Sequence, residues 1–321
     1  MKTEIKNKAS FTIVTPVYNR SDCIGKCIES VVNQNYDDVE HWIVDDGSTD
    51  ATYDIIKEYA AIYPFIRHYR FTKNRGVNAA RNYAIKNSAK DFIILLDSDD
   101  YFVENAINTV QGIIQTYPNF RHYLFAQNDR MGYYNKNSIL KEKHTVITFS
   151  DFLTEKISGD FAHVIASDLF RDFPFNEEFR IYEHLNFYQI FKAERKLLFT
   201  KTIIVNRDRE RSDSVTKETQ LKNKVALNNQ YGVLKEMLSL FKYDYLEFHE
   251  EKVLSNLIKR TFILGIALGK YKENDLLKKT AKELNIKIPF VYEIIYNMKL
   301  GFILQKILFL YSIIKNSIFT K

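Results

Sequence analysis

The sequence places several carboxylates directly after an apolar run. Asp97, Asp99 and Asp100 follow residues 92–96, all of them apolar, with only Ser98 between the first two. Like charges this close together destabilise one another unless a cation offsets them. Carboxylate oxygens select hard divalent cations, so this group predicts a site for Mg²⁺ or Mn²⁺.

Two further polar groups come where predicted strands end. Tyr18 follows the β-branched run 11–14, and Asp46 follows the run 41–44. The carboxyl ends of parallel strands meet at one edge of a sheet, which is where open α/β folds bind ligands. We therefore expect these side chains to lie beside the aspartates that follow residues 92–96.

The elements that must position these side chains alternate between strand and helix signals. Short β-branched or apolar runs predict strands, and apolar residues at helical spacing between them predict helices. The predicted strands are residues 11–14, 41–44, 66–71 and 92–96. The last is wholly apolar and so should be buried on both faces. The alternation predicts an α/β fold with a parallel, doubly wound sheet.

The rest of the chain divides into two parts of different character. Residues 120–210 are less regular, with strand-like runs at 123–126 and 145–149 among aromatic-rich loops. Beyond them the apolar residues keep a helical period to the end, with no strand signal. We therefore predict a domain of residues 1–215 and a helical region of residues 216–321.

Composition and charge narrow the class of protein. Hydrophobic residues make up 45% and charged residues 27%, which is typical of a globular chain. The net charge of +6 favours an anionic ligand or membrane surface, and no nucleic-acid-binding motif accompanies it. Two cysteines allow no disulfide framework, and the charged N-terminus lacks the pattern of a signal peptide, so we expect a cytoplasmic protein.

The usual glycine patterns for phosphate binding are absent. The ten glycines form neither G-x-G-x-x-G nor G-x-x-x-x-G-K-[ST]. A bound diphosphate would therefore be held by a metal ion and cationic side chains. Arg75 and Arg81 flank the predicted start of the helix after residues 66–71 and are placed to help.

Four motifs, in this order and spacing, resemble those of the family 2 nucleotide-sugar glycosyltransferases of bacterial surface-polysaccharide type. They are Thr15-Pro16-Val17-Tyr18-Asn19, Asp45-Asp46-Gly47-Ser48-Thr49-Asp50, residues 74–82, and Leu96-Asp97-Ser98-Asp99-Asp100. The resemblance implies a GT-A (Rossmann-like) fold, a mostly parallel sheet flanked by helices, with a C-terminal helical extension. It assigns residues 10–105 to the nucleotide-binding half and 106–215 to the acceptor half.

The resemblance implies how the donor nucleotide is bound. Thr15 and Tyr18 would line the nucleotide pocket, and Asp46 would accept a hydrogen bond from the uracil imide. Arg81 would lie near the nucleotide and its phosphates. The implied donor is a UDP-sugar, although the residues alone do not exclude another nucleotide.

The resemblance also assigns the aspartates after residues 92–96. Asp97-Ser98-Asp99 matches the D-x-D motif of the family. Asp97 would lie near the ribose, and Asp99 would bind the Mn²⁺ or Mg²⁺ that bridges the diphosphate, with Asp100 in support. The metal and the nearby arginine would offset the charge that grows on the departing diphosphate.

The expected catalytic base departs from the family pattern. The family carries a Glu-Asp pair at the start of a helix in the acceptor half, where this chain has Glu183-His184. The resemblance puts His184 in the base position and makes Glu183 its orienting or hydroxyl-binding partner, but the chemistry also permits the reverse. Two alternatives stay open: His163 serves the acceptor site, or the base lies elsewhere in residues 120–215.

The implied function is that of an inverting, metal-dependent glycosyltransferase in cell-surface polysaccharide or glycan biosynthesis. The acceptor would be a glycan or a lipid-linked saccharide. One alternative is a catalytically impaired, sugar-nucleotide-binding scaffold that has lost its base. Another is a nucleotidyltransferase, which should begin with a glycine-rich basic segment that residues 15–19 lack.

The C-terminal segment allows three roles. Residues 302–314 are rich in apolar side chains, with Lys306 inside the run and Lys315 at its end. The segment could lie in a membrane interface with its basic residues toward anionic lipid, which would make the protein peripheral at the inner face of the membrane. Alternatively, it packs on the catalytic domain, or it pairs with a second subunit in a homo-oligomer.

Overall fold

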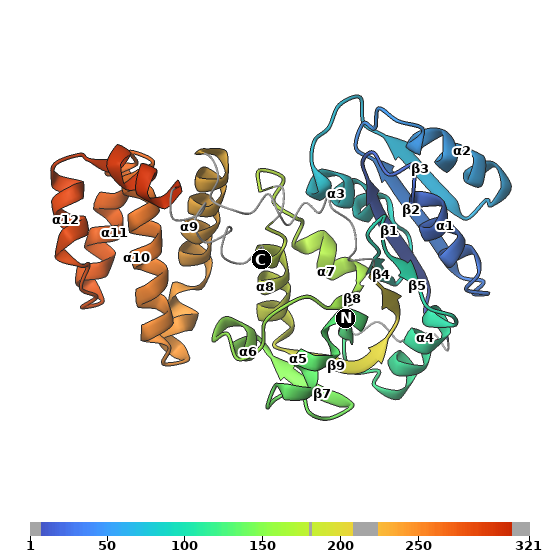
Figure 1. Ribbon diagram of the computed structural model, residues 1–321. Helices are drawn as coiled ribbons and strands as arrows, with labels where there is room; N and C mark the ends of the chain where they lie inside the picture. Colours follow the sequence, from blue (N-terminus) through green and yellow to red (C-terminus); the bar gives the residue numbers. More distant parts are fainter. Residues whose placement is uncertain (1–7, 180–181, 208–223, 310–321) are drawn as a thin grey trace. The chain divides into compact units, whose positions relative to one another are not determined.

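The computed structural model describes residues 8–179, 182–207 and 224–309, and the chain divides into two compact units (Figure 1). The first unit is Met1–Arg211 and the second is Ser212–Lys321. The first is built on a large sheet flanked by helices, and the described part of the second is helical. This is the predicted fold class: α/β, with a helical C-terminal extension.

The described sheet of the first unit has the strand order β3-β2-β1-β4-β8-β6-β9-β7. Its strands are β1 (Phe11–Val17), β2 (Val39–Asp45), β3 (Ile66–Arg70), β4 (Phe92–Leu95), β6 (His122–Ala126), β7 (His144–Thr148), β8 (Ala162–Ala166) and β9 (Lys196–Ile203). A separate antiparallel pair is formed by β5 (Tyr101–Phe102) and β10 (Val205–Asn206).

The four strands predicted in the first part of the chain are parallel neighbours. The central strand β1 pairs with β2 on one side and with β4 on the other, and β2 pairs with β3. All seven residues of β1 are buried, as expected of a strand covered on both faces. The helices between these strands are α1 (Ile24–Val32), α2 (Thr52–Ile62) and α3 (Val77–Asn87). This arrangement brings the carboxyl ends of β1, β2 and β4 to one edge.

The second half of the sheet is mixed rather than parallel. β8 is antiparallel to both β4 and β6, β7 is antiparallel to β9, and only β6 and β9 are parallel. The sequence did not predict β8, because its apolar run is interrupted by His163. That histidine is buried against His122 of β6, with 3.0 Å between Nδ1 of His163 and Nε2 of His122. The helices here are α4 (Ala106–Thr116), α5 (Met131–Lys136), α6 (Phe149–Leu153), α7 (Ser167–Asp172) and α8 (His184–Glu194).

The second unit consists of packed helices in its described part. They are α9 (Lys224–Glu247), α10 (Glu251–Ala267), α11 (Tyr271–Glu283) and α12 (Phe290–Asn297), followed by helical residues 301–309. A Cβ atom on Gly265 of α10 would lie 2.1 Å from Oδ1 of Asn274 on α11, so the two helices can approach this closely only at a glycine.

None of the helices in the described ranges combines the length and apolar character needed to cross a membrane. Of the apolar segment 302–314, for which the sequence allowed three roles, residues 310–314 lie outside the described residues.

Candidate active site

The loops after β1 and β2 are joined directly by hydrogen bonds. The backbone N–H of Asn19 donates to Oγ of Ser48 at 2.9 Å, and the N–H of Thr49 donates to Oδ1 of Asn19 at 2.8 Å. The loop after β4 lies against the start of α1, where the Cys27 thiol is 3.7 Å from the carbonyl of Asp97. The three polar groups that the sequence singled out therefore gather at one edge of the sheet.

The carboxylate of Asp46 organises the turn that precedes α3. Its Oδ1 accepts from the N–H of Arg75 at 2.6 Å, and its Oδ2 accepts from the N–H of Gly76 at 2.8 Å. Gly76 adopts a φ of 99°, a conformation that glycine reaches without steric cost. Asp46 is buried at the sheet edge. Its position thus ties the loop after β2 to the arginine-bearing segment, a contact that spacing alone did not reveal.

Thr15 and Tyr18 occupy different environments. Tyr18 is 42% exposed at the edge, where an aromatic ring can stack on a base. The Thr15 side chain is fully buried, and its hydroxyl is 2.9 Å from Nε2 of His41. The structure therefore brings Tyr18 to the site, whereas the Thr15 side chain lies beneath it inside the sheet.

Arg81 links the two halves of the first unit. Its side chain is only 6% exposed; Nη2 lies 2.9 Å from Oδ1 of Asp97, and Nη1 is paired with Oε2 of Glu183. Burial alone would lower the pKa of Arg81, but the two carboxylates raise it above its ordinary value. The guanidinium is thus a fixed cation between Asp97 and Glu183, which are far apart in sequence.

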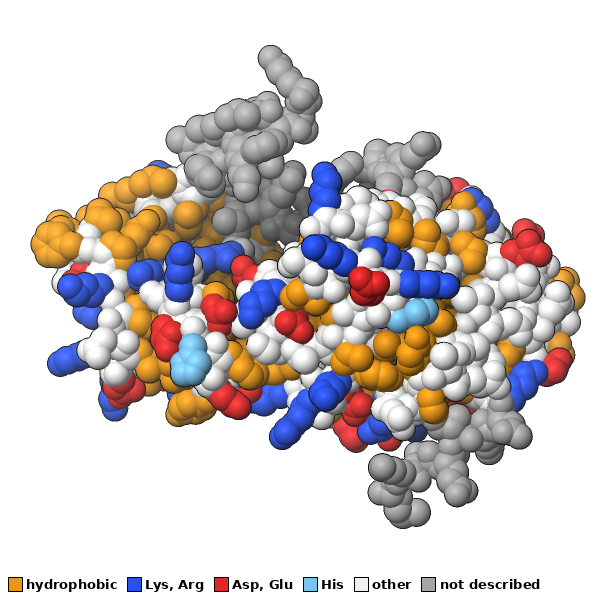
Figure 2. Space-filling view, turned by 90° about the horizontal axis from the view of Figure 1, so that it is seen from below, with side chains coloured by type: hydrophobic (Ala, Val, Ile, Leu, Met, Phe, Trp, Pro, Cys, Tyr) orange, Lys and Arg blue, Asp and Glu red, His pale blue; other side chains and the backbone are white. Residues whose placement is uncertain are grey.

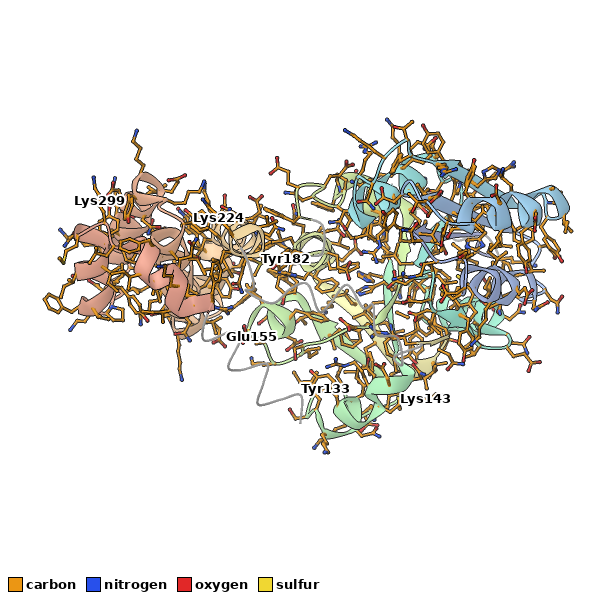
Figure 3. All side chains as sticks on the ribbon, turned by 45° about the horizontal axis from the view of Figure 1, so that its top comes forward. Tyr133, Lys143, Glu155, Tyr182, Lys224 and Lys299 are labelled. Carbon is orange, nitrogen blue, oxygen red and sulfur yellow. The ribbon has the colours of Figure 1, made fainter. Side chains whose placement is uncertain are left out.

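Glu183 and His184 stand at the start of α8. They follow Tyr182, which is labelled in Figure 3. The imidazole of His184 packs edge-on against the rings of Tyr182 and Tyr188, at centroid distances of 5.9 and 6.0 Å. Burial lowers the pKa of His184 to about 4, so the ring is neutral near pH 7 and able to accept a proton. The Glu183 carboxylate points instead to Arg81.

A cavity of about 250 Å³ opens beside this helix start. Aromatic rings form much of its wall, including Phe161, Phe187 and Tyr188, and polar groups come from Asp160, His163 and His184. His163 stacks on Phe187 at 3.9 Å between ring centroids, and burial lowers its pKa to about 3. A cavity with aromatic walls and a few polar groups has the character of a small-molecule binding site.

Among the described residues, the D-x-D segment offers carboxylates to a metal ion but no complete set of protein ligands. Asp97, Ser98, Asp99 and Asp100 form a turn in which the N–H of Asp100 donates to the carbonyl of Asp97 at 3.0 Å. Across the described ranges, His, Cys, Asp and Glu form no group of three or more that could hold a metal ion. Mg²⁺ is commonly bound by one or two carboxylates together with substrate phosphates, which is what Asp99 and Asp100 can offer.

Acidification is expected to destabilise the folded protein. Burial lowers the pKa values of His41 and His163 to about 3 and that of His184 to about 4, from an ordinary 6.5. Between these values and 6.5 the unfolded chain binds more protons than the folded one. The free energy of unfolding should therefore fall as the pH drops below 6.5, by up to about 1.4 kcal/mol per pH unit for each histidine.

Urea denaturation at about pH 7 and about pH 5 checks this expectation. His184→Gln should show a shallower decline than the unchanged protein, because one titrating group is missing. An unfolding free energy that stays constant over this range would contradict the assignment of these histidines as neutral in the folded protein.

The sequence is similar to those of known glycosyltransferases. Residues 12–166 match the sequence profile described as "Glycosyl transferase family 2". The chain is 27% identical to the GalNAc(5)-diNAcBac-PP-undecaprenol beta-1,3-glucosyltransferase of Campylobacter jejuni, over 86% of this chain and 89% of that protein. It is 31% identical to the glycosyltransferase GlyA of Streptococcus pneumoniae, over 39% of this chain and 18% of that protein.

Solved structures share the fold at low sequence identity. Residues 1–349 of S. aureus TarS in complex with UDP-GlcNAc superimpose with a TM-score of 0.60 at 20% identity, covering 81% of this chain and 75% of that chain. The mannosyltransferase PcManGT from Pyrobaculum calidifontis, in complex with GDP-Man and Mn²⁺, gives 0.57 at 15% identity, covering 95% and 88%. Like GlyA, several other curated relatives are much longer: the chain spans only 15% to 16% of the length of two of them.

Proposed function

Since residues 12–166 belong to glycosyl transferase family 2, we propose that this protein is an inverting glycosyltransferase that acts on a nucleotide-sugar donor. The sugar would pass to an acceptor hydroxyl in bacterial cell-surface polysaccharide or glycan biosynthesis. The observation that best supports this proposal is the pairing of Arg81 with both Asp97 and Glu183. It sets the donor-side D-x-D motif beside the residues that could deprotonate an acceptor.

The proposed donor is a UDP-sugar. The structural neighbour TarS was solved with UDP-GlcNAc, which supports a uridine nucleotide here. Tyr18 is exposed at the sheet edge and would stack on the base, while Asp46 would accept from the uracil imide. Because the Asp46 carboxylate also accepts from two backbone N–H groups, it would present a fixed oxygen to the base.

Asp46→Ala is expected to weaken UDP binding by about 1.5 to 3 kcal/mol, the range for a hydrogen bond to a charged group. The change also removes the two hydrogen bonds that hold the turn at Arg75 and Gly76, and this loss should weaken UDP binding further. Isothermal titration with UDP measures the effect, and Asp54→Ala on the exposed side of α2 is the matched control. Unaltered UDP affinity in a folded Asp46→Ala protein would rule out the uracil role.

We assign the metal ion to Asp99, with Asp100 and Asp97 in support. The structural neighbour PcManGT was solved with GDP-Man and Mn²⁺, which supports Mn²⁺ or Mg²⁺ as the partner of the diphosphate. When bound, such an ion offsets the negative charge of the leaving diphosphate. Arg81 is held beside Asp97 by its ion pair and would add a second, fixed positive charge at the same place.

The acceptor hydroxyl would be deprotonated by His184, with Glu183 as the alternative base. An aspartate in a polar setting has a pKa near 4, and burial brings His184 to the same value. The Glu-His pair therefore offers about the base strength of the family's Glu-Asp pair, with a neutral rather than an anionic base. The cavity beside His184 would hold the sugar of the acceptor against its aromatic rings.

The acceptor would be a glycan or a lipid-linked saccharide. The name of the Campylobacter relative describes a saccharide linked to PP-undecaprenol, which supports a lipid-linked saccharide as the acceptor. A lipid-linked acceptor requires the enzyme to work at a membrane surface, so we place its action at the cytoplasmic face of the cell membrane.

A non-catalytic, sugar-nucleotide-binding scaffold is the second candidate function. The observation in its favour is the lowered pKa of His184, because partial burial of the ring makes the imidazolium form unstable. Tight UDP binding without transfer to any acceptor would support the scaffold. The nucleotidyltransferase alternative gains no support from the match to glycosyl transferase family 2.

A screen of sugar nucleotides tests the proposed activity. Each donor is incubated with the protein and Mn²⁺ or Mg²⁺, and release of the nucleoside diphosphate is measured with and without membrane-extracted acceptor lipids. We expect release to depend on a metal ion and to be faster for UDP-sugars than for GDP-sugars. If no donor is consumed under any of these conditions while UDP still binds, the catalytic proposal fails and the scaffold replaces it.

A further inference from the structure

The second unit exposes a stripe of apolar side chains along two consecutive helical segments, and we propose that this stripe docks the protein on an anionic lipid bilayer. The stripe, here called the docking face, is formed by Phe290, Ile294, Met298, Phe302, Ile303 and Ile307. Figure 2 shows apolar side chains gathered on this unit, at the left of the view. Half of the docking face precedes the segment 302–314 that the sequence singled out.

The apolar residues of α12 lie on one side of the helix. At about 100° per residue, Phe290, Ile294 and Met298 point within about 80° of one another. Tyr296 points the opposite way and holds α12 to the unit: its hydroxyl pairs with Asp275, and its ring packs on Phe262 at 5.4 Å. No residue of α12 is buried, and Phe290 is 75% exposed. The side turned outward is therefore apolar.

Residues 301–309 repeat this arrangement. Leu304 is buried, and Leu308 packs against the core formed by Leu227, Tyr231 and Leu264. Phe302 and Ile307 point away from this packed side and are 59% and 54% exposed. Two successive helical segments thus pack one side against the unit and expose apolar side chains on the other, which is the pattern of helices that lie in a membrane interface.

The charged residues beside the docking face favour a lipid bilayer over a protein as its partner. Lys287, Lys299 and Lys306 are exposed, while Glu293 is the one acidic residue in the range 284–309. Lys299 lies in the turn after α12 (Figure 3). By helical spacing, Lys306 falls within the apolar stripe itself. Protein interfaces are depleted in lysine at their core, whereas at a bilayer the lysine stem lies along the apolar surface and the ammonium reaches anionic headgroups.

Co-sedimentation of the full chain with lipid vesicles tests the docking face. We expect the protein to sediment with vesicles of phosphatidylcholine mixed with phosphatidylglycerol, and much less with phosphatidylcholine alone. Raising the salt concentration should weaken the binding. Phe290→Ser combined with Phe302→Ser should lower the vesicle affinity by at least about tenfold. Lys299→Gln and Lys306→Gln should each lower it by about fivefold.

The matched control is Ile62→Ser, which removes an apolar side chain of 67% exposure from α2 of the first unit. Circular dichroism checks that each variant is folded, and the lysine variants test the same face without touching its apolar side chains. Because the readout is binding, its outcome is independent of sugar transfer. The proposal fails if no vesicle binds the protein, if all variants bind like the unchanged protein, or if the serine variants convert a stable dimer into a monomer.

Discussion

Replacing Asp99 with asparagine is expected to lower the rate of sugar transfer by about 10²- to 10⁴-fold. The substitution keeps the size of the side chain but removes the negative charge that we assign to the metal ion. Charge stabilisation by a bound metal contributes several kcal/mol to such a transition state, and each 1.4 kcal/mol is about tenfold in rate. Asp37→Asn, at an aspartate that is 96% exposed before β2, is the control and should be fully active.

Binding of Mn²⁺ in the presence of UDP provides a readout that does not depend on turnover. Titration should show that Asp99→Asn loses most of its Mn²⁺ affinity while the Asp37→Asn control keeps it. Excess EDTA should abolish transfer by the unchanged protein. Full activity in EDTA, or unaltered Mn²⁺ binding by Asp99→Asn, would show that the assignment of the metal ion to Asp99 is wrong.

His184→Gln is expected to reduce turnover by about 10²- to 10⁴-fold while leaving the affinity for the donor unchanged, because a positioned general base contributes that much. Glu183→Gln should have a different signature. Its carboxylate is paired with Arg81, so its loss also disturbs the side chain that holds Asp97, and donor affinity should fall together with turnover. Measuring kcat and donor KM for both variants separates the two roles.

The pH profile gives a second check on the base. The pKa of His184 is lowered to about 4, so the acid limb of kcat/KM should lie near that value rather than near 6.5. Glu194→Gln, at the other end of α8, is the control for a glutamate change on the same helix. If His184→Gln and Glu183→Gln both transfer sugar at nearly the original rate, neither residue is the base.

The part of the first unit that holds β1 to β4 could be predicted well because its signals are local. The strands β1 to β4 are short runs of apolar or β-branched residues, and the polar residues at their ends follow directly in sequence. Their order in the sheet brings those residues together, as expected for a parallel α/β fold.

The mixed half of the sheet could not be predicted in the same way, because its contacts join distant residues. The apolar pattern of β8 is broken by His163, whose partner His122 lies on a different strand. The ion pair between Arg81 and Glu183 joins residues 102 positions apart, and no local sequence pattern predicts it. The same holds for Thr15, whose burial against His41 depends on how β1 pairs with β2.

Arg81 also limits how the substrate preferences of such a protein can change during evolution. One guanidinium pairs with both Asp97, which we assign to the donor, and Glu183, which we assign to the acceptor. A lysine could not reproduce this fork because its ammonium is a single point charge. Substitutions at the two carboxylates should therefore be non-additive, since each alters the partner of the other. New donor and acceptor preferences would then have to be acquired together rather than one at a time.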